Sequence, residues 1–217
     1  DGFLLKLSPT GGYLAASQIV SSAGQESLRS VAIDAAGQVY VCGYFSGTAD
    51  FDPSPSIFNL VSNGTSSGFV AQYSNAGAYL NAWTIDAPTS LEQLIKVKVD
   101  GAGKVWLAGF CNSTAKDLDP GPGVINPAAL GTNNAFLARY EPTGVLMSHF
   151  AITGSSAAAS LNGFDIDSYG DLLVAGTFAN AVDFDPGTGI VNLQGAPTTD
   201  CFLAKYSPAG SLRWATA

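Results

Sequence analysis

Six aspartates at a fixed spacing are the residues of this sequence with the clearest potential for chemistry. They form three pairs, each with one residue between its members and a proline directly after it: Asp50 and Asp52, Asp117 and Asp119, and Asp183 and Asp185. Two carboxylates in one loop can supply hard oxygen ligands to Ca²⁺, and backbone carbonyls can complete the coordination shell. Calcium is therefore the one cofactor that the sequence suggests, and it would bind in every copy of the pattern.

The same pairs also have a purely structural interpretation. A calcium loop usually offers three or more side-chain ligands in close succession, whereas each of these loops offers two and then a proline. Aspartate side chains in turns accept hydrogen bonds from nearby backbone amides, and proline fixes the turn. We therefore expect these aspartates to stabilise their loops, and calcium binding is the alternative. A further set, Asp34, Asp100 and Asp167, precedes x-x-Gly and is typical of turn initiation.

Catalytic signals are sparse. His149 is the only histidine, and the chain has no G-x-S-x-G, no nucleophile–His–Asp pattern and no phosphate-binding loop. We expect His149 to lie in a core or at a strand edge, and we expect the protein not to be an enzyme.

The element that must position these residues is an internal repeat. One phrase begins FLLKLSPTGGYL at Phe3 and returns at Phe69, Phe136 and Phe202, 66 or 67 positions apart each time. A second phrase, VAIDAAGQVYVCG at Val31, returns at Val97 and Phe164, and the Asp-x-Asp-Pro phrase follows it in each unit. Three phrases that keep one order and one period identify a tandem array.

Each unit has the alternation of β-strands. In the first full unit we expect strands at Leu28–Asp34, Gln38–Phe45, Ile57–Val61, Phe69–Tyr73 and Tyr79–Ile85, with a loop at Asp50–Ser56. In the second of these strands, Val39, Val41 and Gly43 would share one face, and Tyr40, Cys42 and Tyr44 the other. A glycine recurs there as Gly43, Gly109 and Gly176, and we expect it to allow blades to approach closely.

The fold class predicted is all-β, with tandem four-stranded antiparallel blades of about 66 residues in a β-propeller or propeller-like arc. A β-solenoid is the alternative. We expect a single array over 1–217, with a half blade at 1–20 and blades at 28–86, 94–152 and 161–217. Closed propellers have at least four blades. We therefore expect completion by a longer array, by association of chains, or by end-to-end addition that forms rings or filaments.

Composition narrows the classes of partner. The net charge is −8 with nine lysines and arginines, which disfavours nucleic-acid binding. No apolar stretch is long enough for a membrane helix, and the opening residues lack the features of a signal peptide. Cys42, Cys111 and Cys201 have no metal-site spacing; we expect buried free thiols, with one disulfide between neighbouring blades as the alternative.

The recurring string D-x-F-(L/V)-A-(K/R/Q)-Y-S-x-x-G, followed by L-x-x-(V/I)-x-(V/I)-D-x-x-G-x-V-Y-V-x-G, resembles the bacterial SBBP-type β-propeller repeat. Val31–Gly43 and Phe202–Gly210 with Asp200 match it best, and Asp183–Gly189 resembles an inserted D-F-D-P-G-x-G stretch of some surface proteins. The resemblance covers essentially the whole chain. It implies a secreted or surface-displayed bacterial protein, but not an activity.

We therefore expect a non-enzymatic extracellular or cell-surface repeat protein with a structural, adhesive or assembly role, which associates with itself or with neighbouring repeats. The alternative is a propeller that binds a glycan or another ligand through exposed aromatics. Its candidates are Tyr40, Trp83, Trp106 and Trp214, most of which we expect in the core. A propeller lyase or hydrolase is the weakest of the three hypotheses, because charged residues are sparse.

Overall fold

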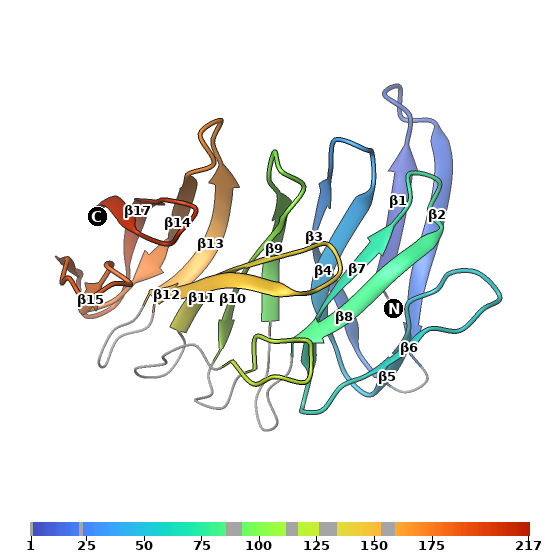
Figure 1. Cartoon of the computed structure of the whole chain (residues 1–217), viewed down its shortest axis with the longest axis horizontal. Helices are drawn as coiled ribbons and strands as arrows, with labels where there is room; N and C mark the ends of the chain where they lie inside the picture. Colours follow the sequence, from blue (N-terminus) through green and yellow to red (C-terminus); the bar gives the residue numbers. More distant parts are fainter. Residues whose placement is uncertain (1, 22–23, 86–92, 112–116, 126–133, 153–158) are drawn as a thin grey trace.

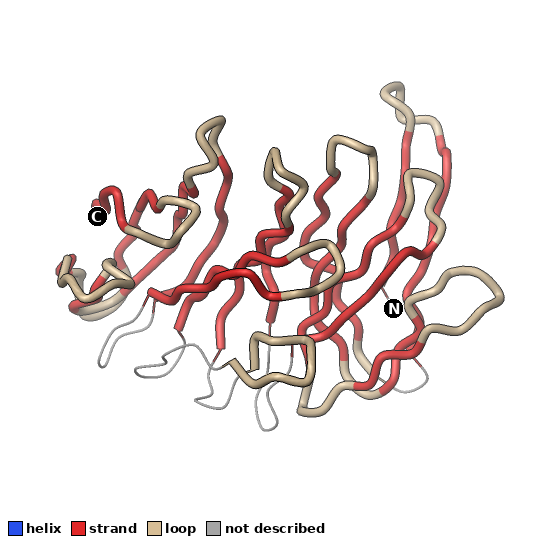
Figure 2. Tube along the Cα trace, in the orientation of Figure 1, coloured by secondary structure: helices blue, strands red, loops and turns tan. Residues whose placement is uncertain are grey.

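The computed structural model of the chain describes residues 2–21, 24–85, 93–111, 117–125, 134–152 and 159–217. In these ranges all regular secondary structure is β-strand. The sheets follow one another along an arc, from β1 and β2 at one end to β14 and β17 at the other (Figure 1). The tube in Figure 2 shows the same arrangement, with strands joined by loops and without helices in the described ranges.

Three four-stranded antiparallel sheets repeat along the chain, and each has its strands in sequence order once the short excursions are set aside. The first contains β3 (Glu26–Ile33), β4 (Val39–Phe45), β7 (Ser67–Tyr73) and β8 (Tyr79–Ile85). The second contains β9 (Gln93–Val99), β10 (Val105–Cys111), β11 (Asn134–Tyr140) and β12 (Leu146–Ile152). The third contains β13 (Ala159–Ile166), β14 (Leu172–Phe178), β17 (Asp200–Tyr206) and β18 (Leu212–Thr216). The prediction of tandem four-stranded antiparallel blades is confirmed.

The chain opens with two strands, β1 (Gly2–Leu7) and β2 (Tyr13–Ser21), which correspond in sequence to the third and fourth strands of a blade. Tight turns join the strands within each hairpin. In the turn between β3 and β4, Gly37 adopts a φ of 80°, which an L-residue rarely adopts, and its amide donates to the Asp34 carbonyl. The recurring glycines are therefore a backbone requirement of these turns.

A short hairpin interrupts the first and third blades between their second and third strands. In the first blade it consists of β5 (Thr48–Asp50) and β6 (Asn59–Val61), and in the third of β15 (Ala181–Asp183) and β16 (Asn192–Gln194). β5 pairs with β2, through Val20 opposite Asp50 and Ser21 opposite Ala49, so the hairpin extends the preceding sheet. The sequence pattern placed Asp50–Ser56 in a loop and missed β5.

The hydrophobic core is divided into three clusters, one at each junction of neighbouring sheets, which we call seams. The first seam lies between β1–β2 and the first blade, the second between the first and second blades, and the third between the second and third. The predicted alternation in β4 is confirmed, because Val41 and Phe45 belong to the first seam whereas Tyr40 and Cys42 belong to the second. The first and second blades therefore each contribute one face to each of two seams, as expected for stacked propeller-type units.

The glycine of each second strand lies opposite a β-bulge in the first strand of its own sheet. Gly43 faces Leu28 and Gly176 faces Leu161, and the register shifts directly after these partners. A Cβ at Gly43 would collide with the carbonyl oxygen of Ser27. The expectation that these glycines serve the approach of neighbouring blades is therefore wrong for Gly43: the close contact lies within one sheet, at a bulge.

Candidate functional site

The first aspartate of each Asp-x-Asp-Pro loop holds the loop closed. Asp117 Oδ1 accepts hydrogen bonds from the amides of Asp119 (2.9 Å) and Ile125 (2.9 Å). Asp50 Oδ1 accepts from Asp52 N (3.0 Å) and Phe58 N (2.9 Å), and Asp183 Oδ1 accepts from Asp185 N (3.0 Å) and Val191 N (2.9 Å). One carboxylate oxygen therefore spans eight residues in every copy, as the structural interpretation of the pattern predicts.

The second aspartate makes the turn that follows. Asp52 Oδ1 accepts from Ser54 N at 2.9 Å, Asp119 Oδ1 from Gly121 N at 2.8 Å, and Asp185 Oδ1 from Gly187 N at 2.9 Å. The loop then bends back over this carboxylate so closely that a Cβ at Gly123 or Gly189 would collide with Oδ2 of Asp119 or Asp185. The small residues of the loop are therefore required for the chain to wrap around the carboxylate.

The residue between the two aspartates anchors the loop in a seam. Phe51, Leu118 and Phe184 are fully buried, and the hydroxyl of a tyrosine on the third strand donates to the carbonyl oxygen of each. These bonds are Tyr73 to Phe51 at 3.0 Å, Tyr140 to Leu118 at 2.9 Å and Tyr206 to Phe184 at 2.9 Å. Burial is the main cause that raises the pKa of all three tyrosines above the ordinary value; the loop carboxylates add to it, and for Tyr73 the neighbouring Tyr79 does too. These hydroxyls are therefore donors and not acids.

The six predicted site residues are not brought together, because each pair lies in its own loop and on its own seam. Within the described ranges, no three His, Cys, Asp or Glu side chains gather as they would around a metal ion. The chemistry of each loop is that of a carboxylate pair with part of its oxygens bonded to amides. Calcium binding by the loops stays a prediction.

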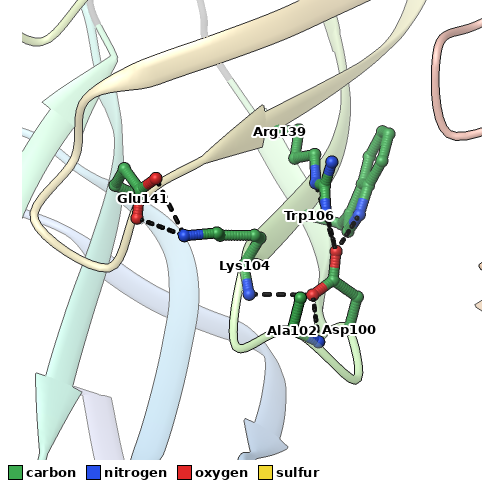
Figure 3. A network of polar contacts seen from close by, with 6 residues as sticks. All are labelled: Asp100, Ala102, Lys104, Trp106, Arg139 and Glu141. Carbon is green, nitrogen blue, oxygen red and sulfur yellow. Dashed lines mark hydrogen bonds and ion pairs between the residues drawn. The ribbon is translucent and has the colours of Figure 1, made fainter.

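The turn aspartates carry a second recurring polar cluster, best developed at Asp100 (Figure 3). Asp100 Oδ1 accepts from the amides of Ala102 and Lys104, both at 2.9 Å. Its Oδ2 accepts from Trp106 Nε1 (3.2 Å) and from Arg139 Nε (3.1 Å) and Nη2 (2.5 Å). Burial alone would raise the pKa of Asp100, but the hydrogen bonds from Lys104 N, Arg139 and Trp106 outweigh it, and the pKa lies below the ordinary value.

The same corner has different partners in the other blades. In the first, Tyr40 OH lies 3.4 Å from Asp34 Oδ2 and accepts from Gln72 Nε2 at 2.8 Å, so the side chains that meet Asp34 are neutral. In the third, Lys205 Nζ lies 2.7 Å from Asp167 Oδ2 and 3.3 Å from Asp171 Oδ2. The corner is thus a structural position that tolerates neutral or charged pairs. The turn-initiating role predicted for these aspartates agrees with their bonds to turn amides.

A hollow of about 890 Å³ opens beside the first Asp-x-Asp-Pro loop. Its walls come from β1, β2, the loop and the turn between β7 and β8: Phe3, Ala16, Ser17, Gln18, Val20, Asp50, Asp52, Pro53, Ser54, Ala76, Gly77, Ala78 and Tyr79. A second recess of about 200 Å³, lined mainly by β1 and β3 side chains, shares Ser17 and Gly77 with it. No motif in the sequence marks this hollow; the signal that could have located it is the small side chain of Ser17 where two other repeats carry an aromatic residue.

The structure also places the four aromatic residues predicted as possible ligand-binding residues, and His149. Tyr40, Trp106 and Trp83 are buried, whereas Trp214 is 41% exposed, so three of the four candidate ligand-binding aromatics belong to the core. His149 lies half-buried on β12, the edge strand of its sheet, and burial lowers its pKa.

Cys42 is a buried free thiol, as expected. Cys201 is free but exposed, so the expectation of burial is wrong for it: along β17 it alternates with the buried Phe202 and Ala204 and shares the exposed face with Leu203. The side chain of Cys111 lies outside the described residues.

Comparisons with known proteins point to the same class of fold. No protein-family profile matches the chain. The chain is similar to the uncharacterised WD repeat-containing protein L264 of Acanthamoeba polyphaga mimivirus, with 22% identity over an alignment of 264 residues. The alignment covers the whole chain but only 19% of that protein, so the chain spans about a fifth of its length. WD repeats are four-stranded propeller blades of about 40–45 residues; the longer period here includes the β5–β6 excursion.

In the part of the chain that the structure describes, no helix could span a bilayer.

The repeated sheets and the similarity to a WD repeat-containing protein together show that the chain is a repeat protein with a β-propeller-like fold, built from antiparallel four-stranded units.

Proposed function

We propose that this chain is a non-enzymatic assembly module of SBBP-type repeats, exported to the bacterial surface, which binds units of its own repeat type through the face of β1 and β2. This face, which we call the end face, consists of Phe3, Leu5, Leu7 and Tyr13. The observation that carries the proposal is the exposure of these side chains, compared with that of their counterparts in the complete blades.

The counterparts of Phe3, Leu5 and Leu7 are buried in seams, and Tyr79, the counterpart of Tyr13 in the first blade, is half-buried. Phe3 is 70% exposed, whereas Phe69, Phe136 and Phe202 are at most 4% exposed. Leu5 corresponds to Ala71, and Leu7 to Tyr73; these two counterparts are 0% and 3% exposed, against 46% and 49% for the leucines. Contiguous apolar side chains of this size on a sheet favour burial against a protein partner.

The backbone of β1 supports the same partner. β7, β11 and β17 each pair with a strand on both sides, whereas β1 pairs with β2 alone in the described part of the chain. A free strand edge next to an apolar face accepts a further strand by main-chain hydrogen bonding. In the complete blades that neighbour is the second strand of a repeat unit, so a repeat unit is the partner of matching shape.

A non-catalytic role is favoured by the use that the fold makes of its acidic residues. The loop and corner aspartates accept hydrogen bonds from backbone amides, so these carboxylates serve to stabilise loops and turns. The similarity to a WD repeat-containing protein adds support, since four-stranded propeller blades serve widely as interaction scaffolds.

Sedimentation velocity of the purified chain over a concentration series tests the proposal. We expect association with a Kd of about 1 mM or tighter, weakened at least about tenfold by the double change Phe3→Ser and Tyr13→Ser. Tyr169→Ser is the matched control, because Tyr169 is 86% exposed on a turn of the third blade and lies far from the end face. A chain that stays monomeric throughout, or that associates equally well after the double change, contradicts the proposal.

The location is tested separately. Protease treatment of intact cells that express the native protein should cleave it, whereas a cytoplasmic marker should stay whole. Protection equal to that of the marker contradicts the surface location without bearing on assembly.

A further inference from the structure

The hollow beside the first loop has its origin in the sequence of one repeat, at position 17. Ser17 lies opposite Leu4 in the β1–β2 ladder, Trp83 opposite Val70 in β7–β8, and Phe150 opposite Leu137 in β11–β12. The three are therefore equivalent positions of the fourth strand. Two of them carry a large aromatic side chain and one carries a hydroxymethyl group. The equivalent residue of the third blade, opposite Leu203, is Thr216, which is also small.

The aromatic rings fill the second and third seams at this position. The Trp83 ring lies 4.6 Å from the ring of Tyr140, and the Phe150 ring lies 4.9 Å from that of Tyr206. Each also covers a turn glycine, since a Cβ at Gly144 would lie 2.9 Å from Trp83 Cγ and one at Gly210 would lie 2.8 Å from Phe150 Cδ1. The first seam therefore lacks the ring that fills this position in the second and third seams.

In the first seam, the space that corresponds to the rings of Trp83 and Phe150 is bordered by the small residues of the β7–β8 turn. A Cβ at Gly77 would meet only Ser17 Oγ, at 3.6 Å. Tyr79 closes this wall, half-buried, with its ring 4.7 Å from that of Phe58. The hollow thus has one wall suited to the face of a ring.

The opposite wall is acidic. Asp50 and Asp52 use Oδ1 for backbone amides, and within the described residues neither Oδ2 has a hydrogen bond or an ion pair. The lining contains no lysine or arginine, while Ser17, Gln18 and Ser54 add neutral polar groups. Carboxylate oxygens accept short, strong hydrogen bonds from hydroxyl groups and attract ammonium groups.

We propose that this hollow binds a neutral or cationic oligosaccharide. A sugar ring presents an apolar C–H face, which buries well against an aromatic ring, and hydroxyl groups at its edge, which suit carboxylate acceptors. A volume of about 890 Å³ lies within the range of ligand pockets and accommodates two or three sugar rings. Uronic acids and sialic acids would meet uncompensated carboxylates and are excluded by charge repulsion. This proposal does not rest on the assembly proposed above, although the hollow and the end face share Phe3.

Isothermal titration calorimetry with the whole chain tests this site. The probes are cellotriose and maltotriose, which are neutral, the glucosamine trisaccharide at pH 6, which is cationic, and the galacturonic acid trisaccharide, which is anionic. We expect at least one neutral or cationic probe to bind with a Kd of about 1 mM or tighter. The anionic probe should bind at least about tenfold more weakly.

The decisive variant is Ser17→Trp, which places in the first seam the side chain that fills the second. We expect it to weaken binding at least about tenfold while the midpoint of chemical denaturation stays the same or rises, so loss of fold is distinguished from loss of the site. Asp52→Asn, which keeps an oxygen for the Ser54 amide, should weaken binding of the cationic probe most. Asp119→Asn is the matched control in the second seam and should leave binding unchanged.

Three results would overturn the proposal: no binding of any neutral or cationic probe in this range, undiminished binding to the Ser17→Trp variant, or equal binding of the anionic probe. If the hollow binds a partner protein and no saccharide, the saccharide titrations will show no heat of binding, which is the first of these results.

Discussion

The first and second seams have the same frame and different contents. In both, an Asp-x-Asp-Pro loop is closed by a carboxylate, and a tyrosine hydroxyl holds the carbonyl of the buried residue between the aspartates. The fourth strand of the preceding unit then supplies Trp83 to the second seam, and Ser17 to the first. We call the hydrogen bonds of the loop aspartate and the tyrosine the frame of a seam, and the fourth-strand side chain at this position its filling. The frame is the same in both seams although the filling differs. The residues that stabilise a unit are therefore distinct from the residue that occupies the space between units.

This separation explains why the period survives in a sequence whose strands differ. The hydrogen bonds of the frame all lie within one unit, and their backbone partners are amides and carbonyls that every sequence provides. The filling depends on one side chain per seam. A unit can therefore gain or lose a recess without losing its loop, and the predictions below test whether the two are independent.

Removal of the ring from the second seam should have the largest effect. Trp83→Ser reproduces the first seam in the second and should lower the free energy of unfolding by about 3–5 kcal/mol, because it empties a filled core position. Urea denaturation followed by far-ultraviolet circular dichroism measures the change. A loss under about 1 kcal/mol would mean that the second seam closes over the gap, and the comparison of the two seams would then fail.

Removal of the loop carboxylate should cost less and should cost the same in both seams. Asp50→Ala and Asp117→Ala each leave two backbone amides without their acceptor, and each should lower the free energy of unfolding by about 2–3 kcal/mol. The same denaturation measurement, made on both variants in parallel, is the check. A clearly smaller loss for Asp50→Ala would show that the hollow weakens the loop beside it, and that frame and filling are coupled.

The reverse exchange should stabilise the first seam. Ser17→Trp adds apolar contacts against the β7–β8 turn and should raise the free energy of unfolding by about 1–2 kcal/mol, as cavity-filling changes commonly do. Tyr169→Trp, on an exposed turn, is the control for the added indole. A loss of stability greater than about 1 kcal/mol would show that the backbone around Ser17 is too narrow for the ring.

The tyrosine hydroxyls should have the smallest effect and one that depends on pH. Tyr73→Phe and Tyr140→Phe each remove one hydrogen bond and should cost about 1 kcal/mol at neutral pH. Because burial raises the pKa of both tyrosines, the folded state keeps a proton that the unfolded state releases above pH about 10. Wild-type stability should therefore fall as pH rises, by about 1.4 kcal/mol per tyrosine at pH 11.

At that pH each phenylalanine variant should equal or slightly exceed the wild-type protein in stability, which denaturation at pH 7 and pH 11 measures. An unchanged difference at the two values would mean that the hydroxyl ionises in the folded protein as it does in water.

Much of this fold could be predicted from the sequence because its signals are local and repeated. The alternation of Val39, Val41 and Tyr40 identifies the two faces of β4, and the turn glycines locate the hairpins. The loop-stabilising interpretation of the aspartates follows from the tendency of this side chain to accept hydrogen bonds from amides two residues ahead. These features depend on neighbours in sequence, which are visible in a single unit.

The rest depends on residues in different units. β5 is three residues long and is recognised by its pairing with β2 of the preceding unit, which no pattern within Thr48–Asp50 reveals. The hollow exists because position 17 carries a serine and not an aromatic side chain. That difference is recognised only when equivalent positions of the fourth strands are compared between repeats. Trp214 is a further example, because it lies opposite Lys205 and so occupies the column of Asn81 instead of that of Trp83.

The pairing of β5 with β2 also bears on how the chain folds during synthesis. Because the β5–β6 hairpin extends the sheet of β1 and β2, it finds its partner strand already made when it leaves the ribosome, since chains emerge from the N-terminus. The direction of translation therefore coincides with the direction in which the sheets are extended. A circular permutant that places residues 24–85 ahead of residues 2–21 would synthesise the hairpin before its template, and its refolding after synthesis would have to close that contact over a long loop.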